Sequence, residues 1–530
     1  MDNKFQMVAK TFGGLEEVLR DELIALGAGN VEMGKRMVAF EGDLEMMYRA
    51  NLCCRTALRI LKPIAKFTAD DTDELYDAVR DYDWSQVMGP DSTFCIDSTV
   101  NSREFTHSKY VSYRVKDGIA DHFSDKYGRR PSVRLTGADV QLNVHILDNR
   151  ITISLDSSGE PLSKRGYRVE QTEAPINEVL AAGIIMMTGW RGDCDLADPM
   201  CGSGTFLIEA ALIAANINPG IFRQGFAFEK WPDFDRELFE RLYNDDSAER
   251  EVNIKIYGGD IDPEAGSIAR RNIRSAKVDD MVELVCRPFS EWTDNAPDGV
   301  LVTNPPYGER LKPENITALY KSIGSTLKNY FKGWHAWIIG YRDEHFSAIG
   351  LKPTTKIPLD NGSLECSLRE YVMFDGSYSD FRASGNDLGR DDEQREDRRP
   401  RKMKHISNDE WKKETRKFQG MRHSKPRRDD RGDREERQDR KGRFDRDRRF
   451  DRDERPQRNG RFDRDRRFDR PDRKARFDRD ERRDSAFAPA RHVANRGPRL
   501  PEDSAVVFDV PRLRKRKGWK KPGEASDAES

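Results

Sequence analysis

A polar stretch follows an apolar run in residues 300–311, which read VLVTNPPYGERL. An exocyclic amine on a nucleobase is a poor nucleophile, because its nitrogen lone pair is delocalised into the ring, so it needs acceptors placed for its two N–H groups. Asn304 and Pro305 offer a side-chain and a backbone acceptor that the paired prolines hold rigidly, and Tyr307 offers a ring on which an extruded base stacks. The stretch therefore predicts a site for a flipped base. The alternative is an ordinary strand-ending turn, which N-P and P-P dipeptides also form.

A glycine-rich loop lies about a hundred residues earlier, in the sequence LADPMCGSGTFLIEA. The loop leaves a predicted strand at Asp198, passes Gly202 and Gly204, and enters a predicted helix near Thr205. Glycine removes a Cβ, so a ligand can approach the backbone at the carboxyl end of a strand. The dinucleotide pattern GxGxxG is incomplete and the pattern GxxxxGK[ST] is absent, so neither NAD nor a nucleoside triphosphate is favoured.

A second strand end, YGGDIDP, brings a carboxylate to the same region. Asp260 can accept both hydroxyls of a ribose, and Ile261 can pack on an adenine face. Alternatively, Asp260 and Asp262 both cap the helix that starts at Pro263. We assign the cap to Asp262 and the ribose to Asp260. A nucleoside-bearing ligand without phosphate fits the two loops, and S-adenosylmethionine is one such ligand.

These loops need a sheet to bring them together, and residues 175–375 alternate between strand and helix patterns as a doubly wound α/β sheet does. Strands are predicted at DCDLADP, IKIYGGDI, VELVCR, GVLVTNP and AWIIGY, so each loop follows a strand. Residues 1–155 instead mix amphipathic helices with alternating strands such as QLNVHILDNRITISLD, which indicates an α+β module.

The C-terminal segment differs from the rest of the chain in its net charge. The chain has 530 residues, 35% of them charged, and residues 390–530 carry a net charge of +15 against −16 for the rest. The string RFDR recurs five times in this end segment without apolar periodicity, so we predict a disordered tail over residues 381–530. Its arginine and phenylalanine side chains suit contact with RNA phosphates and bases, the alternative being a merely solvated mixed-charge tail.

The remaining composition predicts a reduced, cytoplasmic protein without a metal. The seven cysteines form no CxxC pair, and the eight histidines form no cluster with them. The first residues contain no apolar core of signal-peptide length, and no later run approaches the roughly 20 apolar residues of a membrane span.

Together, DPMCGSGT, GGDIDP and NPPYGERL resemble the class I S-adenosylmethionine-dependent methyltransferases that modify exocyclic amines, and especially the RlmL-type guanine-N2 methyltransferases of 23S rRNA. The resemblance implies a Rossmann-like, seven-stranded mixed sheet over residues 161–380. It also implies a ferredoxin-like segment over residues 1–55 and a THUMP RNA-binding domain over residues 56–160.

Carried onto this chain, the resemblance places three groups of residues in the site. The methionine part of the cofactor would meet Asp198, Gly202 and Gly204; its ribose would meet Asp260; and the target guanine would meet Asn304, Pro305 and Tyr307. Basic patches at KYGRRPSVR and KRGYR would contact RNA.

Two departures from the family pattern stand out. Many relatives carry an acidic residue after the third strand that contacts the adenine amine, whereas this chain has Arg287 and Pro288 there. Longer relatives also add a second domain that makes 7-methylguanosine, and we expect no such second activity here. Three other functions stay open: a tRNA guanine-N2 methyltransferase, a DNA adenine-N6 methyltransferase, and a ribosome-assembly factor that binds RNA without catalysis.

Overall fold

The computed structural model describes residues 4–293, 296–308, 313–362, 364–374 and 376. The predicted disordered tail and its predicted RNA contacts lie outside these residues. Within the described ranges, no helix is long and apolar enough to cross a membrane.

The first half of the chain builds one continuous sheet, which in the described residues has eight strands in the order β2-β3-β1-β4-β8-β7-β5-β6. The predicted ferredoxin-like and THUMP parts share this sheet, because β1 pairs with β4. Its strands are β1 (Phe5–Lys10), β2 (Gly29–Gly34), β3 (Met37–Gly42), β4 (Arg59–Thr68), β5 (Thr93–Asn101), β6 (Ser132–Val133), β7 (Val140–Leu147) and β8 (Arg150–Asp156). Its helices are α1 (Glu16–Ala25), α2 (Leu44–Cys53), α3 (Thr72–Asp81) and α4 (Ser108–Tyr127), with a short 3-10 turn at Trp84–Gln86.

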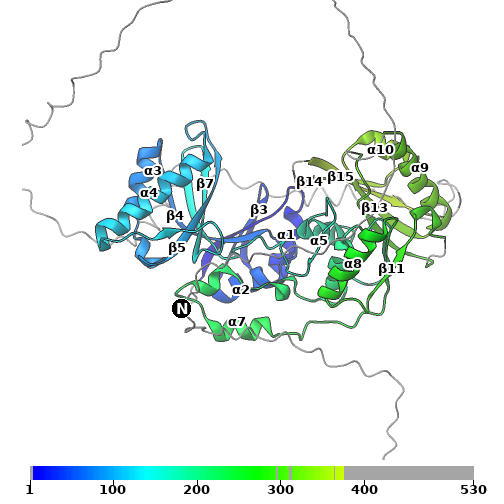
Figure 1. The fold of residues 1–530 in the computed structure, drawn as a ribbon, viewed down its shortest axis with the longest axis horizontal. Coiled ribbons are helices and arrows are strands. Elements are labelled where there is room, and N and C mark those ends of the chain that lie inside the picture. Colours follow the sequence, from blue (N-terminus) through cyan, green and yellow to red (C-terminus); the bar gives the residue numbers. More distant parts are fainter. Residues whose placement is uncertain (1–3, 294–295, 309–312, 363, 375, 377–530) are drawn as a thin grey trace, which may run out of the picture. The chain divides into compact units, whose positions relative to one another are not determined.

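Helices cover this sheet through regularly spaced apolar residues. Leu75 and Val79 of α3, together with Val111 and Val115 of α4, enter the same buried core as the strands. Figure 1 shows α3 and α4 lying side by side. The side chain of Asp71 accepts hydrogen bonds at the start of α3, which is why that helix begins there.

The second half builds the predicted doubly wound sheet, with seven strands among the described residues in the order β11-β10-β9-β12-β13-β15-β14. Strands β11 to β13 are parallel, and β15 and β14 run antiparallel at one edge. Its strands are β9 (Leu196–Asp198), β10 (Ile256–Asp260), β11 (Val282–Cys286), β12 (Gly299–Thr303), β13 (Trp334–Gly340), β14 (Thr355–Asn361) and β15 (Leu364–Val372). The seven-stranded mixed sheet expected from the sequence is confirmed.

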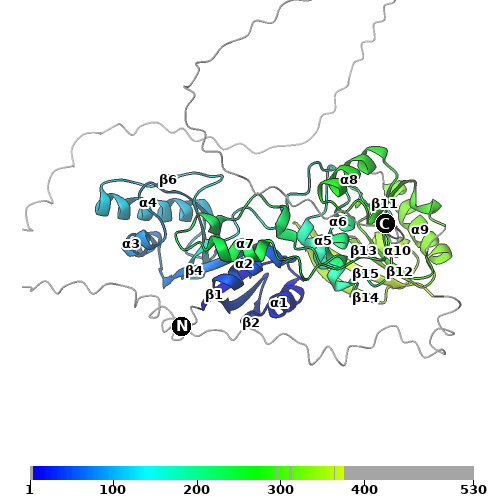
Figure 2. The same cartoon turned by 90° about the horizontal axis from the view of Figure 1, so that it is seen from below.

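Helices pack on both faces of this second sheet, as Figure 2 shows. Strand residues alternate between the two cores: Val300 and Val302 of β12 face the core that includes α5 and α6, and Leu301 faces the core that includes α9. The helices are α5 (Glu178–Met187), α6 (Thr205–Ala214), α7 (Arg236–Tyr243), α8 (Pro263–Ser275), α9 (Pro313–Tyr330) and α10 (Asp343–Ala348).

Residues 219–243 follow α6; Ile221 and Phe222 pack against the second sheet's core, whereas the later aromatic residues join the core of the first sheet. They contain two 3-10 turns, Pro219–Phe222 and Ala227–Lys230, and then α7. Phe228 stacks on Tyr48 of α2 with ring centroids 4.5 Å apart, and Phe239 meets the same tyrosine edge-on at 5.6 Å. This segment therefore ties the catalytic half of the chain to the core of the first sheet.

Candidate active site

Three of the predicted functional loops follow neighbouring strands. Asp260, Asp198 and Thr303 end β10, β9 and β12, which are consecutive parallel strands of the second sheet. Carboxyl ends of parallel strands meet at one edge, and open α/β sheets bind ligands where the strand order reverses. Here the order reverses between β9 and β12, so the sheet brings the three loops together as the sequence predicted.

Asp198 connects the glycine loop to the base loop. Its Oδ1 accepts a hydrogen bond from the hydroxyl of Thr303 at 2.9 Å and one from the backbone N–H of Met200 at 3.2 Å. Only 1% of Asp198 is exposed, and this burial raises the pKa of its carboxyl to about 7; the nearby charge of Asp260 adds to the rise, and the two hydrogen bonds oppose it. A ligand cation beside Asp198 would therefore favour its charged form.

The two glycines of the loop have different tasks. Gly202 has φ of +52°, and a Cβ built on it would meet only Thr172 Oγ1, at 3.6 Å, so the space above it can hold a ligand. Gly204 has φ of +81°, and a Cβ there would lie 3.2 Å from the Cβ of Ala269 on α8. Gly202 thus leaves room for a ligand, whereas Gly204 allows close packing of the loop on α8.

Asp260 binds the glycine loop and is not the cap of the following helix. Its Oδ2 accepts from the backbone N–H of Gly202 at 3.0 Å, and its Oδ1 accepts from the N–H of Asp262 at 3.0 Å. Asp262 is the cap of α8, because its side chain accepts from the N–H of Glu264 at 2.9 Å. Each Asp260 oxygen keeps a further lone pair for a ribose hydroxyl.

The part of the site expected to hold adenine contains an exposed apolar residue, Ile261, and an arginine, Arg287. Ile261 is 70% exposed at the end of β10, which suits a flat aromatic ligand covering it. Arg287, in the place of the acidic residue of relatives, lies over the ring of Trp292, with its guanidinium carbon 5.4 Å from the ring centroid. The residues around the glycine loop and Ile261 therefore fit an adenosyl ligand, although the usual acidic contact to its amine has been replaced.

The base loop has an internal hydrogen bond that the sequence did not predict. The hydroxyl of Tyr307 donates to Asn304 Oδ1 at 2.5 Å, and burial raises the pKa of that hydroxyl, so it stays protonated. The Tyr307 ring meets the Tyr341 ring edge-on, with centroids 5.6 Å apart. Pro305 is buried and Pro306 exposed. Asn304 keeps one oxygen lone pair for an amine, and stacking of a base on Tyr307 stays a prediction.

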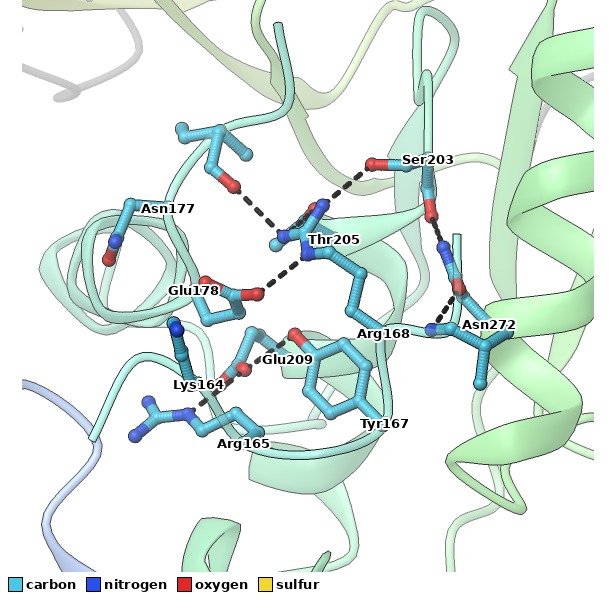
Figure 3. A network of polar contacts seen from close by, with 12 residues as sticks. Lys164, Arg165, Tyr167, Arg168, Asn177, Glu178, Ser203, Thr205, Glu209 and Asn272 are labelled. Carbon is cyan, nitrogen blue, oxygen red and sulfur yellow. Dashed lines mark hydrogen bonds and ion pairs between the residues drawn. The ribbon is translucent and has the colours of Figure 1, made fainter. Parts of the chain in front are cut away.

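The prediction that KRGYR is an RNA-contact patch is wrong for its two arginines, whereas Lys164 is exposed and its contact with RNA stays a prediction. Arg165 has only 2% of its side chain exposed and pairs with Glu209 inside the protein. Arg168 forms an ion pair with Glu178 and donates to the hydroxyl of Ser203 in the glycine loop (Figure 3). Sequence reasoning took these arginines for surface charges and missed the contact of Arg168 with the glycine loop and that of Arg165 with Glu209 of α6.

The other predicted patch, KYGRRPSVR, is on the surface but largely balanced by acids. Lys126 pairs with Asp83 at 2.8 Å, and Arg130 pairs with Asp121 at 3.2 Å. Arg134 is exposed. RNA contact by this patch stays a prediction. Across the described residues, no group of three or more His, Cys, Asp or Glu side chains is arranged to hold a metal ion.

Models of three known domain families match the chain in the order that the fold suggests. The RlmL ferredoxin-like domain matches residues 6–61, the THUMP domain residues 69–156, and the RMKL-like methyltransferase domain residues 165–370.

Two curated relatives illustrate the range of lengths. "Putative RNA methyltransferase slr0064" of Synechocystis is 37% identical over 364 residues, which are 68% of this chain and 95% of the relative. The "Ribosomal RNA large subunit methyltransferase K/L" of Syntrophotalea carbinolica is 39% identical over 386 residues, which are 70% of this chain and 54% of the relative. The chain therefore spans about half the length of the K/L relatives it matches.

Solved structures agree with this assignment. The structure named "SMU.472, a putative methyltransferase complexed with SAH" (SAH is S-adenosylhomocysteine) superposes with a TM-score of 0.64 at 32% identity, covering 71% of this chain and all of that one. A Listeria monocytogenes protein, named as a predicted N6-adenine-specific DNA methylase, superposes with a TM-score of 0.63 at 31% identity, covering 70% and 97%. The cofactor is S-adenosylmethionine. The chain thus belongs to the RlmK/L family of S-adenosylmethionine-dependent RNA methyltransferases.

Proposed function

We propose that the chain methylates the exocyclic N2 amine of a guanosine in 23S rRNA, in the cytoplasm. The observation that carries this proposal is the position of Asn304 directly after Thr303, whose hydroxyl binds Asp198 at the start of the cofactor loop. An amide oxygen that can bind an amine is thereby joined to the loop that we assign to the methyl donor. The ribosomal name of the K/L relatives supports the choice of RNA.

The residues divide the work between cofactor and base. Asp260 would accept the ribose hydroxyls, Asp198 would face the methionine ammonium, and Gly202 would leave space for the chain between them. Bound S-adenosylmethionine supplies an electrophilic methyl group. Asn304 would accept one N–H of the target amine through its free lone pair, and the carbonyl of Pro305 would accept the other. Both acceptors stabilise the positive charge that develops on the nitrogen during attack.

The alternatives differ in the nucleic acid and in the base. The match to a THUMP domain over residues 69–156 does not by itself distinguish rRNA from tRNA as the substrate. An Asn-Pro-Pro-Tyr loop also suits the N6 amine of adenine in DNA, and the Listeria protein carries the name of such a DNA methylase. The RNA-binding module of this chain favours RNA over DNA.

Mass spectrometry of nucleosides tests the proposal in a deletion strain of the source organism. We expect N2-methylguanosine to fall in purified 23S rRNA, to return with the wild-type gene, and to stay low with Asn304→Ala. A loss confined to tRNA, or a loss of N6-methyladenine from DNA, would replace the proposal by the corresponding alternative. Unchanged nucleosides in every pool, with a ribosome defect that Asn304→Ala repairs, would indicate a non-catalytic assembly factor. The same digests measure 7-methylguanosine, which we expect to stay constant.

A further inference from the structure

Arg168 lies in the segment that leads from β8 of the first sheet to α5 of the second, and its guanidinium binds the cofactor loop. Nη1 donates to the hydroxyl of Ser203 at 2.9 Å, and Nη2 donates to the hydroxyl of Thr205 at 2.9 Å. Nε donates to Glu178 at 2.6 Å, and Nη2 also reaches the carbonyl of Ile176 at 3.1 Å. Figure 3 shows the guanidinium between Glu178 and the two hydroxyl residues.

The same segment also contacts helix α6 one turn further along the helix. Tyr167 donates its hydroxyl to Glu209 at 2.8 Å, and Arg165 approaches the same carboxylate oxygen at 3.4 Å. Glu209 and Thr205 are four residues apart in α6, so they lie on one face of the helix. Residues 165–168 therefore contact one face of α6 at two points: Thr205 in its first turn and Glu209 one turn later.

A buried asparagine fixes the loop from α8. Asn272 is 1% exposed; its oxygen accepts the N–H of Val169 at 2.9 Å, and its amide nitrogen donates to the carbonyl of Ser203 at 2.9 Å. The segment and the loop are thus joined both through Arg168 and through Asn272 (Figure 3).

We propose that Arg168 is a positioning residue for the cofactor loop. Gly202 and Gly204 flank Ser203 and make the loop backbone intrinsically mobile, because glycine has the widest conformational freedom. The planar guanidinium of Arg168 donates to the hydroxyls of Ser203 and Thr205, and its ion pair with Glu178 fixes its orientation. This keeps the N–H of Gly202 aligned with Asp260, where the cofactor binds.

Arginine is required at this position because its donors form a rigid fork. A lysine ammonium could keep the ion pair with Glu178, but a single nitrogen cannot hold the two hydroxyls and the Ile176 carbonyl in this geometry. The role concerns cofactor binding, so it holds whichever nucleic acid and base the enzyme methylates.

Arg168→Lys tests this role in the full-length protein, with Arg271→Ala as the matched control. Arg271 binds Glu170 of the same segment at 2.6 Å, on the surface, and none of its hydrogen bonds to described residues reaches the loop. We expect Arg168→Lys to raise the Kd for SAH, measured by calorimetry, by about 10- to 100-fold, the range for a lost charge-assisted hydrogen bond. The KM for S-adenosylmethionine should rise in parallel, with kcat at saturation and RNA affinity within about twofold of the wild type. Arg271→Ala should leave all four values within that range.

A double-mutant cycle with Thr205→Val separates an indirect from a direct contact. If Thr205 acts through Arg168, the two substitutions together should weaken SAH binding by less than the product of their separate effects. Multiplying effects would assign the hydroxyl of Thr205 to the cofactor itself and overturn this part of the proposal.

Three other results would overturn the proposal as a whole. These are an unchanged Kd in a folded Arg168→Lys protein, an equal rise in Arg271→Ala, and a fall in kcat without a rise in KM. If Arg168→Lys does not fold, the pair Arg168→Gln and Glu178→Gln removes both charges together and leaves no unpaired buried carboxylate. Failure of that protein to fold as well would make Arg168 a purely structural residue.

Discussion

Replacing Asp198 with asparagine should stabilise the protein and weaken cofactor binding at the same time. The carboxyl is buried, and its pKa rises from 3.8 in the unfolded reference to about 7 in the fold. A group whose pKa rises on folding destabilises the fold progressively as pH increases from the unfolded to the folded pKa. Its effect is therefore smallest in acid and complete above pH 7.

The size of the effect follows from the two pKa values. Proton linkage gives a penalty of about 2 kcal/mol at pH 5 and about 4 kcal/mol at pH 8, a change of roughly 2–3 kcal/mol. The asparagine side chain cannot ionise, but its oxygen can still accept from Thr303 and Met200 in place of the carboxylate oxygen. The free energy of unfolding of Asp198→Asn, relative to the wild type, should therefore increase by about this amount between pH 5 and pH 8.

Chemical unfolding of both proteins across this pH range measures the difference, and the other titrating groups cancel because they are common to both. Calorimetry with S-adenosylmethionine at pH 8 should show affinity about 10- to 100-fold weaker for Asp198→Asn, because a charged contact to the ligand ammonium is lost. The loss should shrink at pH 5.5, where the wild-type carboxyl is mostly protonated. Parallel stability curves for the two proteins would refute the buried-carboxyl reasoning, and equal affinities at pH 8 would refute the ligand contact.

Other substitutions separate the remaining roles. Asp260→Ala should weaken cofactor binding by about 1–3 kcal/mol, because ribose hydroxyls lose their acceptor, and unchanged calorimetric affinity would contradict this. Asn304→Ala should lower the single-turnover rate about 10²–10³-fold with normal cofactor affinity, and a nearly normal rate would contradict its role. Gly204→Ala should lower the free energy of unfolding by about 1–2 kcal/mol or more, because of its positive φ, as a denaturant titration can test. Truncation after Gly385 should preserve catalysis at saturating RNA but make the salt dependence of RNA binding shallower, whereas identical salt slopes would favour a merely solvated tail.

The sequence was sufficient to predict the catalytic sheet and the meeting of its loops. Strands β9, β10 and β12 have apolar runs that end in Asp198, Asp260 and the residue before Asn304, and parallel strands necessarily place such ends at one edge. Asp262 was also predictable as the cap of α8, since Pro263 follows it at the first helical position. These features depend on local pattern and on strand order alone.

The contacts of residues 165–168 with the glycine loop and with α6 could not be predicted in the same way. The signal was a single acid, Glu209, in a helix whose other residues are apolar or hydroxyl-bearing and all buried. A buried carboxylate needs partners, so it implies a cation from elsewhere in the chain. The sequence does not say which of its many arginines reaches it, because that depends on how the segment after β8 crosses α6.

The segment 219–243 illustrates another limit of local patterns. Its aromatic residues predict burial but not against which core. Phe226 and Phe228 stack with ring centroids 5.1 Å apart, and both lie in the core of the first sheet. The guanidinium of Arg223 donates to the carbonyl of Pro161 at 2.9 Å and to that of Lys164 at 2.8 Å, so this insertion also holds the segment that carries Arg168. Contacts between parts of the chain so far apart in sequence arise from tertiary packing.

The hydrogen bond between Asp198 and Thr303 couples the position of the glycine loop to the position of the loop that carries Asn304. Thr303 immediately precedes Asn304, so the bond fixes where the base loop leaves the sheet. Tyr307 then orients the Asn304 amide by donating to its oxygen, which leaves one lone pair on that oxygen. An amine with two N–H groups needs a second acceptor, and we assign that role to the neighbouring carbonyl of Pro305, which follows a rigid ring. In the proposed mechanism, the order Thr-Asn-Pro-Pro-Tyr therefore has two roles: Thr303 would align the loop with the methyl donor, and Tyr307 would fix the direction of the Asn304 acceptor.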